Sequence, residues 1–582
     1  MSRWPRVAAA AVVAALSVAG CSGLPRHSPV EQGHEIGAPV LPPVRFRFEA
    51  PPRGAEPTQI VSGFLAAGWS ADDDYAAARA YLTPQASQRW TPRSHVVVYE
   101  SASSLEVTKS SDSTVRIAVS GAAHLDEHGR YTPAPAGEVI AADVRLAKVD
   151  GQWRIAAVPN EFGLWLSHFY FERAYRPFDV TYADTRTRVL VADRRWFPTV
   201  GGLSTALARA QLEEAPTYLK GVVENNVPAG TTLAVDTVPV TGGVAQVELS
   251  RSALEATADQ RRAMWAQMLT TLRQVPGVRE VSLRVDGRPL ALLSAQSEPK
   301  SVAELGYSPV AGVNVETVVQ RTGSQLTAVP LATWLGRSDE TDRLASAHLP
   351  SIEATWKHVA IGAELRHTVA VSDDDRRLMV WQGKQPRPVP EFGTGLCAPA
   401  IDTEQRLWVA GRSNGATRVW SRPVGAFTLA PSALSAPWLV NRQVQAVAPA
   451  PDGRRLALVS TDAAGVPRVE VSGVVKKSGV PARLNQPWTV ATDIVEPSAV
   501  TWMDDRTLAV VGRHSGGRVA PIIVPLGGGV EPLKGVDTPI QIASLGGPRG
   551  LIVVSEDGTV SRRVGTGWQS RGNIDEIIVP AG

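Results

Sequence analysis

Cysteines, net charge and long hydrophobic runs are all scarce in this sequence. Its 582 residues include two cysteines, Cys21 and Cys397. This number excludes a fold that is stabilised by several disulfides. The formal net charge of +3 provides no basic field of the kind that binds nucleic acid, so we exclude that class of partner. Beyond residue 20 no stretch is long and apolar enough to cross a bilayer.

The first twenty residues have the layout of a signal peptide. Arg3 and Arg6 precede an uncharged, mostly Ala, Val and Leu run over residues 7–20. That run is shorter than the roughly 20 residues of a membrane-spanning helix. It ends in Val18-Ala19-Gly20-Cys21, which resembles the bacterial lipobox. We therefore expect cleavage after residue 20 and a diacylglycerol thioether on Cys21 with an acylated amino group. The protein would be anchored by lipid on the extracytoplasmic face of the cell membrane.

The rest of the chain has an ordinary globular composition. With 44% hydrophobic and 20% charged residues, it is long enough for several domains. Residues 21–52 are rich in Pro and Gly and lack sustained periodicity, so they read as a lipidated tether and linker. Cys397 cannot pair with a lipidated Cys21, so the folded part would depend on its hydrophobic cores alone.

Residues 53–185 are expected to form an α+β domain. A helix should begin near Pro57, and a second short helix should carry Tyr75, Ala78 and Leu82. Alternating apolar residues then predict strands around residues 96–98, 115–119 and 144–146, and Asp150-Gly151 should turn the chain into a further strand at 153–155. Helices followed by a curved antiparallel sheet suggest a cone like the nuclear transport factor two fold.

Residues 186–298 are expected to form a second α+β domain. A strand at 189–191 precedes a helix over 203–212, and a half-buried strand covers 245–249. Thr257 and Gln260 form a potential capping box for a helix that Pro276-Gly277 should stop. A last strand at 281–285 turns at Asp286-Gly287. This order of elements, with its closing helix, Pro-Gly-Val and strand ending in Val-Asp-Gly, resembles the GerMN domain.

Residues 299–582 read almost purely as strands and turns. A unit made of a strand, an acidic or Gly turn and an apolar strand recurs, and its equivalent leucines are Leu378, Leu407, Leu456, Leu508 and Leu551. Intervals of about 30 to 50 residues are close to those of propeller blades, with one interval short. We expect an all-β propeller of five or six blades; a β-sandwich is the alternative.

Taken together, the lipobox, the α+β domain, the GerMN-like domain and the propeller resemble the LpqB lipoprotein family of actinobacteria over nearly the whole chain. The segments that carry most of the resemblance are residues 64–92, Gly151-Gln152-Trp153-Arg154-Ile155 with Pro159 and Asn160, and the GerMN-like closing pattern. The resemblance implies a partner, the extracytoplasmic part of the sensor kinase MtrB. It also implies a role in tuning MtrA and MtrB signalling for envelope growth and division. It offers no catalytic residue, so only Cys21 transfers as a functional position.

Motifs that could carry catalysis fit structural roles better. Residues 411–415 match G-x-S-x-G around Ser413, but strands are expected on both sides, whereas a hydrolase serine needs a strand before it and a helix after it. His124 and His128 fall in an expected turn, where a spacing of four does not align two imidazoles. The cluster Asp72-Asp73-Asp74 lacks the rest of a calcium loop and is expected to start a helix. We expect no catalytic, cofactor or metal site.

Two further features are expected to be structural. Cys397 has no adjacent base and should be a buried, inert thiol. Tryptophans at strand ends of the repeat, including Trp381, Trp408 and Trp420, should pack between blades rather than bind sugar.

Three functions remain in view. The leading hypothesis is a non-enzymatic, lipid-anchored accessory of the sensor kinase. The alternative is a binding module for cell-wall glycan or lipid intermediates, using the cone interior or the propeller channel. The third is a propeller hydrolase that uses Ser413.

Overall fold

The computed structural model of the chain describes residues 50–580, apart from 72, 136, 200–201, 225, 293–297, 309–314, 338–342, 515 and 548. The expected signal peptide, Cys21 and the expected tether up to residue 49 lie outside the described residues. The described residues belong to one compact unit, and strands predominate over helices.

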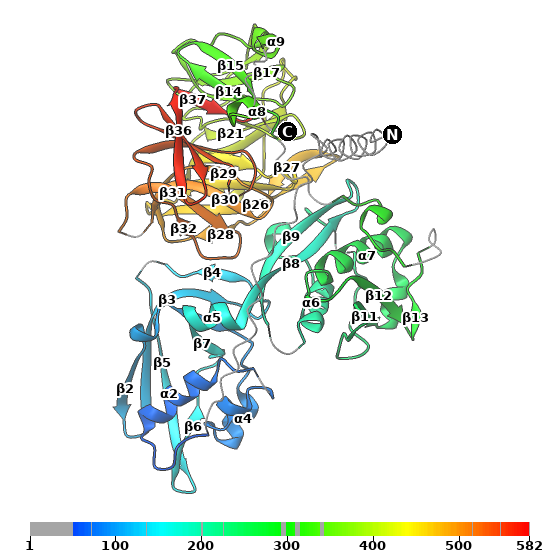
Figure 1. Cartoon of the computed structure of the whole chain (residues 1–582), viewed down its shortest axis with the longest axis vertical. Coiled ribbons are helices and arrows are strands. Elements are labelled where there is room, and N and C mark those ends of the chain that lie inside the picture. Colours follow the sequence, from blue (N-terminus) through cyan, green and yellow to red (C-terminus); the bar gives the residue numbers. More distant parts are fainter. Residues whose placement is uncertain are drawn as a thin grey trace, which may run out of the picture. The chain divides into compact units, whose positions relative to one another are not determined.

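The first part of this unit is an α+β domain (Figure 1). Its helices are α2 (Pro57–Ala67), α3 (Ala76–Arg79), α4 (Pro84–Arg89) and α5 (His168–Ala174), with a 3-10 turn η1 (Ala102–Ser104). Its strands are β1 (Val96–Tyr99), β2 (Glu106–Ser111), β3 (Thr114–Leu125), β4 (Tyr131–Pro133), β5 (Val139–Val149), β6 (Gln152–Ala157) and β7 (Leu164–Ser167).

The sheet of this domain runs in the order β6-β5-β3-β1-β7, and β2 and β4 pair with β3. Helix α2 buries Ile60, Val61 and Phe64 in a core that also holds Ile117 and Ile155. The expected strands and the Asp150-Gly151 turn are confirmed. Two expectations were wrong. The sheet is not wholly antiparallel, because β1 and β7 pair in parallel. The second helix does not reach Leu82: it has only four residues, and Leu82 bridges to Ile155 instead.

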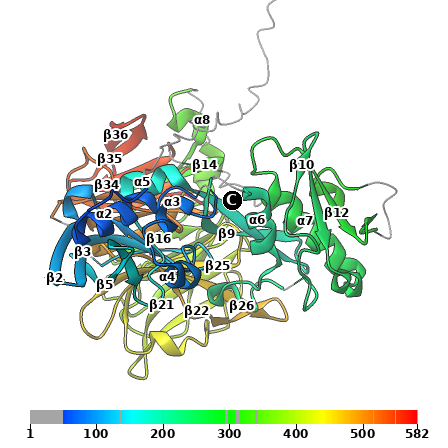
Figure 2. The same cartoon turned by 90° about the horizontal axis from the view of Figure 1, so that it is seen from below.

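The second domain combines a long hairpin with a small sheet and two helices (Figures 1 and 2). The elements are β8 (Tyr175–Asp184), β9 (Val189–Pro198), α6 (Leu203–Leu212), η2 (Thr217–Leu219), β10 (Val240–Thr241), β11 (Val244–Leu249), η3 (Arg251–Glu255), α7 (Ala258–Leu272), β12 (Glu280–Val285) and β13 (Arg288–Pro289). The sheet order is β10-β11-β12-β13, with β11 and β12 parallel.

The expected bounds of α6 and the capping box of Thr257 and Gln260 on α7 are both confirmed. The β8–β9 hairpin was not foreseen as a unit. All ten residues of β8 pair with β9, from Tyr175 with Pro198 to Asp184 with Val189. The expected domain boundary at residues 185 and 186 falls in the turn that joins these two strands, so the pairing places β8 in the same body as β9.

From residue 299 on, the described residues form six sheets. The first joins β14 (Thr317–Thr322) and β15 (Gln325–Pro330) to the last strand, β37 (Glu576–Ile578). The others are β16 (Trp356–Ile361) to β19 (Gln385–Pro388), β20 (Ala400–Ile401) to β23 (Ser432–Ala433), β24 (Gln443–Pro449) to β28 (Trp488–Ala491), β29 (Ile494–Trp502) to β32 (Glu531–Pro532), and β33 (Pro539–Ser544) to β36 (Gly567–Asn573).

The strands between these are β17 (His367–Ser372), β18 (Leu378–Gln382), β21 (Arg406–Ser413), β22 (Ala416–Pro423), β25 (Arg455–Thr461), β26 (Pro467–Lys477), β27 (Val480–Leu484), β30 (Thr507–His514), β31 (Val519–Pro525), β34 (Leu551–Ser555) and β35 (Thr559–Val564). Short helices η4 (Ala303–Leu305), α8 (Leu331–Trp334), α9 (Arg343–His348) and η5 (Pro437–Leu439) interrupt the strands, which the sequence patterns did not predict.

The propeller expectation is confirmed, with six sheets among the described residues. The one short interval in the repeat has a structural cause. Leu407 lies on the second strand of its sheet, as do Leu456, Leu508 and Leu551, but Leu378 lies on the third strand, β18. The repeat unit around Leu378 was therefore matched to the other units one strand too late, which shortens the interval to Leu407.

Candidate functional site

The β8–β9 hairpin contacts the N-terminal domain, the helices of its own domain and the propeller. Its two strands pair with each other along their full length, which leaves one outer edge on each strand. An unpaired strand edge exposes N–H and C=O groups that must find partners. Both edges are covered, each by a different set of elements.

Glutamine side chains cover the β8 edge. Three alternate N–H groups of the strand donate to them: Asp179 to Gln274 at 2.9 Å, Thr181 to Gln211 at 3.1 Å and Ala183 to Gln267 at 3.1 Å. Alternate residues of a strand present their N–H groups on one edge, and residues near two turns apart on a helix share a face. Gln211 of α6, Gln267 of α7 and Gln274 just after α7 thus take the place of a neighbouring strand.

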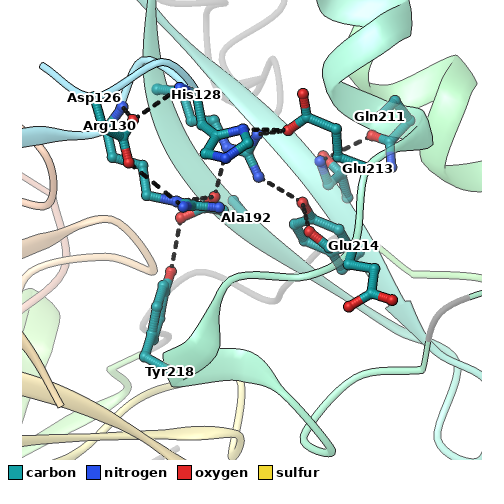
Figure 3. A network of polar contacts seen from close by, with 12 residues as sticks. Asp126, His128, Arg130, Ala192, Gln211, Glu213, Glu214 and Tyr218 are labelled. Atoms are coloured by element: carbon teal, nitrogen blue, oxygen red, sulfur yellow. Dashed lines mark hydrogen bonds and ion pairs between the residues drawn. The ribbon is translucent and has the colours of Figure 1, made fainter. Parts of the chain in front are cut away.

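Arg195 belongs to a polar network around the hairpin, in which Figure 3 labels His128, Glu213 and Tyr218. The side chain of Arg195 is fully buried. It donates to Asp193 at 2.8 Å, to Glu213 at 2.9 Å and to the hydroxyl of Tyr182 at 2.6 Å. Burial alone would lower the pKa of this guanidinium, but Asp193 and Tyr182 raise it above its usual range. Arg195 therefore stays charged, and each of its partners is held in place by it.

A loop of the N-terminal domain, residues 126–130, reaches this network (Figure 3). The carboxylate of Asp126 accepts the backbone N–H groups of His128 and Arg130, each at 2.9 Å, which fixes the shape of the loop. His128 then places Nδ1 3.0 Å from Glu213. Since Glu213 also accepts from Arg195, one carboxylate links the first domain to the buried arginine of the second.

Trp196 on β9 contacts both of the other domains. Its ring lies 4.6 Å from that of Phe171 and 5.9 Å from that of Tyr131, both in the N-terminal domain. Its indole Nε1 donates to the carbonyl oxygen of Gly527 in the propeller at 2.6 Å. One side chain thus joins three domains.

Three arginines of the propeller also reach the hairpin. Arg454 pairs with Asp184 at 2.6 Å, Arg506 donates to Asp179 at 2.7 Å, and Arg455 donates to the carbonyl of Ala192 at 3.3 Å. One hydrophobic cluster extends from the second domain into the propeller. These contacts predict that the second domain and the propeller move as one body.

The propeller also encloses a cavity of about 830 Å³. It is lined from strand β37 of the first sheet and from the first strand of each other sheet, β16, β20, β24, β29 and β33, which places it along the channel. Its wall includes Ala360, Ala400 and Ala446, and its polar groups include Lys357 and Gln443. A cavity of this size, lined by both apolar and polar side chains, is suited to a small ligand that carries polar groups.

Glu576 lies at the wall of this cavity and ties the last strand into the ring. It accepts the backbone N–H of Val359 at 2.6 Å and lies 3.4 Å from Arg321. These contacts connect β37 to β16 and β14. Burial raises the pKa of Glu576 to about 7, although Val359 and Arg321 both act to lower it.

Several residues singled out in the sequence have the expected structural place. Ser413 ends β21, and a turn at Asn414-Gly415 leads into β22, so the motif is a hairpin tip. Cys397 is buried, and burial raises the pKa of its thiol to about 12. Trp381, Trp408 and Trp420 are buried as expected.

Other expectations were wrong. His124 lies on β3 rather than in a turn, and its Nδ1 is 3.3 Å from Nε2 of His95. His128 does lie in the turn, but it contacts Glu213 instead of being freely solvated. Asp73 and Asp74 have positive φ angles and precede α3 rather than starting it.

Within the described ranges, no group of three or more His, Cys, Asp or Glu side chains is arranged to hold a metal ion. In the same ranges, no helix is long and apolar enough to cross a membrane.

We call the contacts of Arg195, Trp196 and Glu213 around the β8–β9 hairpin the junction. The sequence analysis did not identify these residues. A weak signal was available in Val191-Ala192-Asp193-Arg194-Arg195, because Asp193 and Arg195 fall on one face of an alternating strand. Arginine and aspartate are nearly always exposed unless paired, so the pattern alone indicates a solvated face.

Comparisons with known proteins agree with this domain order. The family described as "Lipoprotein LpqB, N-terminal domain" matches residues 50–172, "Sporulation and spore germination" matches residues 169–291, and "Lipoprotein LpqB beta-propeller domain" matches residues 339–581.

Whole proteins are similar as well. The lipoprotein LpqB of Streptomyces coelicolor is 30% identical over 567 residues, which cover 88% of this chain and 87% of the relative. That of Thermobifida fusca is 28% identical over 96% of each chain. Among solved structures, a putative TolB from Agrobacterium tumefaciens matches 44% of this chain and 88% of its own, with 12% identity and a TM-score of 0.32.

Proposed function

The chain belongs to the LpqB lipoprotein family, and from this membership we propose that it is an accessory protein of the sensor kinase MtrB. In this proposal, lipid on Cys21 anchors the protein to the extracytoplasmic face of the membrane. The folded domains bind the extracytoplasmic part of MtrB and modulate signalling by MtrA and MtrB in envelope homeostasis and division. The chain acts by binding and not by catalysis.

The observation that carries the proposal is the junction at the β8–β9 hairpin. A protein that alters a membrane-bound kinase from outside must hold its contact surface at a defined place. Buried ion pairs such as Arg454 with Asp184, whose side chains are 4% and 11% exposed, restrict the geometry of the propeller and the hairpin that they join. Trp196 and Glu213 extend this restriction to the N-terminal domain, through the ring of Phe171 and through His128.

Co-purification from intact cells tests the proposal. The full chain is crosslinked in cells that carry tagged MtrB, and the kinase is isolated with and without this protein. We expect the chain to be recovered with MtrB, and we expect the phosphorylation level of MtrA to change when the gene is deleted. Absence of binding together with unchanged kinase output on deletion would refute the proposal.

A loss of binding in a Trp196→Ala variant that is still exported would place the contact on the joined domains. The matched control is Trp568→Ala. Trp568 is also a partly buried tryptophan whose Nε1 donates to a carbonyl oxygen, that of Lys534 at 2.8 Å, but both residues lie within the propeller, so this contact joins no second domain.

A second function is favoured by the channel cavity. Its volume of about 830 Å³ lies within the usual range of ligand sites, so the propeller could bind a cell-wall glycan fragment or a lipid intermediate. Soluble disaccharide-peptide fragments of the wall should raise the unfolding temperature of the full chain. Ala400→Phe would fill part of the cavity and should abolish that rise. An equal rise in both proteins would rule out the channel as the binding site.

A further inference from the structure

The first and sixth sheets of the propeller face each other across α8. Trp334 of α8 belongs to one hydrophobic cluster with Ile552 and Val560 of the sixth sheet. Ile552 is paired with Arg562 across the neighbouring strand, and Val560 lies two residues before Arg562 on β35. Side chains two residues apart on a strand share a face. Arg562 is therefore on the face that is turned toward α8.

A second arginine reaches the same place from β36. Nη2 of Arg571 donates to the carbonyl oxygen of Leu335 at 3.3 Å, and its guanidinium lies 5.9 Å from the ring centre of Trp334. A Cβ on Gly336 would stand 3.7 Å from Nη1 of Arg571. Arg337 is the next residue along the chain. Three guanidinium groups, on Arg337, Arg562 and Arg571, thus gather at the end of α8.

This arginine cluster has no counter-charge in the part of the chain that the structure describes. None of the three residues forms an ion pair there, and Nε of Arg562 and Nε of Arg571 are buried without a hydrogen-bond partner. Burial lowers the pKa of Arg562, and the charges of Arg571 and Arg337 lower it further. Like charges held together in this way repel each other.

We propose that Arg337, Arg562 and Arg571 form a binding site for a phosphate group, carried as a phosphate monoester or diester. A guanidinium presents a planar fork of N–H donors that matches the oxygens of a phosphate. A carboxylate offers two oxygens in one plane and suits a single arginine, whereas a tetrahedral phosphate offers oxygens in several directions. Phosphate therefore fits three guanidinium groups that come from the segment after α8, from β35 and from β36. The stacking of Arg571 near Trp334 holds one of them in position.

Thermal unfolding of the full chain in detergent tests the site with three soluble probes at constant ionic strength. The probes are inorganic phosphate, glycerol 3-phosphate as a monoester, and glycerophosphoglycerol as the diester of an anionic lipid headgroup. We expect at least one probe to raise the unfolding temperature above that in chloride. In Arg562→Gln and in Arg337→Gln the affinity should fall about ten-fold or more, since each loses charge-assisted hydrogen bonds.

The control variant is Arg563→Gln. Arg563 is adjacent on β35 but points to the other face, where it lies 3.6 Å from Glu531, so its loss changes the net charge equally and should leave the affinity unchanged. A response to the diester alone assigns the site to a lipid headgroup, and a response to phosphate or the monoester alone assigns it to a soluble ligand.

The unfolding temperature without ligand shows whether the three arginines stabilise the fold or only bind a ligand. Because repulsion is relieved, Arg562→Gln should unfold in chloride at the same temperature as the wild type or higher. The proposal is overturned if no probe raises the unfolding temperature, or if the rise is the same in the wild type and in both variants.

Discussion

The carbonyl oxygen of Gly129 accepts the backbone N–H of Trp196 at 2.7 Å, and a Cβ on Gly129 would stand 2.4 Å from the carbonyl oxygen of Trp196. The N-terminal domain therefore meets the hairpin backbone to backbone. Only glycine permits this approach, and the φ of +77° at Gly129 independently favours glycine.

Gly129→Ala should separate the loop at 126–130 from β9. The added methyl group overlaps a backbone atom that cannot rotate away, so we expect faster hydrogen exchange at the amide of Trp196 and earlier proteolysis between the first two domains. Gly137→Ala is the matched control, because Gly137 has the same φ and nothing within 4 Å of its Cβ position. Equal exchange rates in both variants would contradict the close contact.

Arg195→Met should destabilise the second domain strongly. Removal of the guanidinium leaves Asp193 buried with a carboxylate that has lost its main counter-charge, and breaking such a pair costs about 3 to 5 kcal/mol. Urea unfolding measures the loss. Arg209→Met removes an arginine that is 54% exposed and pairs with Asp236, and it should cost little. Similar losses in the two variants would show that burial does not govern the effect.

Gln267→Leu should weaken the contact between α7 and the hairpin. The side-chain oxygen of Gln267 accepts from the backbone N–H of Ala183 and from Asn226. In the variant the N–H of Ala183 would be buried without a partner, whereas Asn226 keeps the carbonyl oxygens of Ala183 and Glu224 as acceptors. An unmatched donor costs about 1 to 3 kcal/mol. Gln246→Leu, on the exposed face of β11, serves as control. If the amide of Ala183 keeps its protection from hydrogen exchange in Gln267→Leu, the glutamine does not cover the strand edge.

Glu576 should make the stability of the propeller fall as the pH rises from about 4.5 to about 7. Burial raises the pKa of this carboxyl to about 7, so over that range the folded state binds a proton that the unfolded state has released. Stability is therefore lost as the pH increases. With about 1.4 kcal/mol per pKa unit, the effect reaches roughly 3 kcal/mol.

In Glu576→Gln the same hydrogen bond from Val359 can form, but nothing titrates. The difference in unfolding free energy between the wild type and this variant, measured in urea at pH 5 and at pH 7.5, should change by most of that amount, about 2 kcal/mol. A constant difference would mean that Glu576 titrates normally.

Cys21→Ala should leave the folded domains unchanged and release the protein from the membrane, or stall its maturation. Fractionation of cells followed by immunoblotting checks this expectation. A variant that remains in the membrane fraction, fully processed as the wild type is, would show that Cys21 is not the anchor.

Local patterns predicted much of the fold because they depend on neighbours in the sequence. The helix at 203–212 and the capping box of Thr257 and Gln260 came from spacing alone and are confirmed. The parallel pairing of β1 with β7 joins segments far apart in the chain, and no spacing within either segment specifies its partner.

The junction was out of reach for a different reason. Arg195 and Glu213 are ordinary surface residues by type, and their contact depends on the loop that carries His128 and on the packing of β8 against α7. A single sequence gives little indication of an ion pair whose partners are brought together only by tertiary packing.

The first sheet of the propeller is completed by its most distant strand. Residues 319–321 of β14 pair with residues 576–578 of β37, so the ring cannot close until almost the entire propeller has been synthesised. Closing so long a loop is slow compared with forming hairpins between neighbouring strands. Until then β14 presents an open edge. A chain that ends before residue 576 would leave that edge unpaired, so truncated chains should aggregate more readily than the full-length protein.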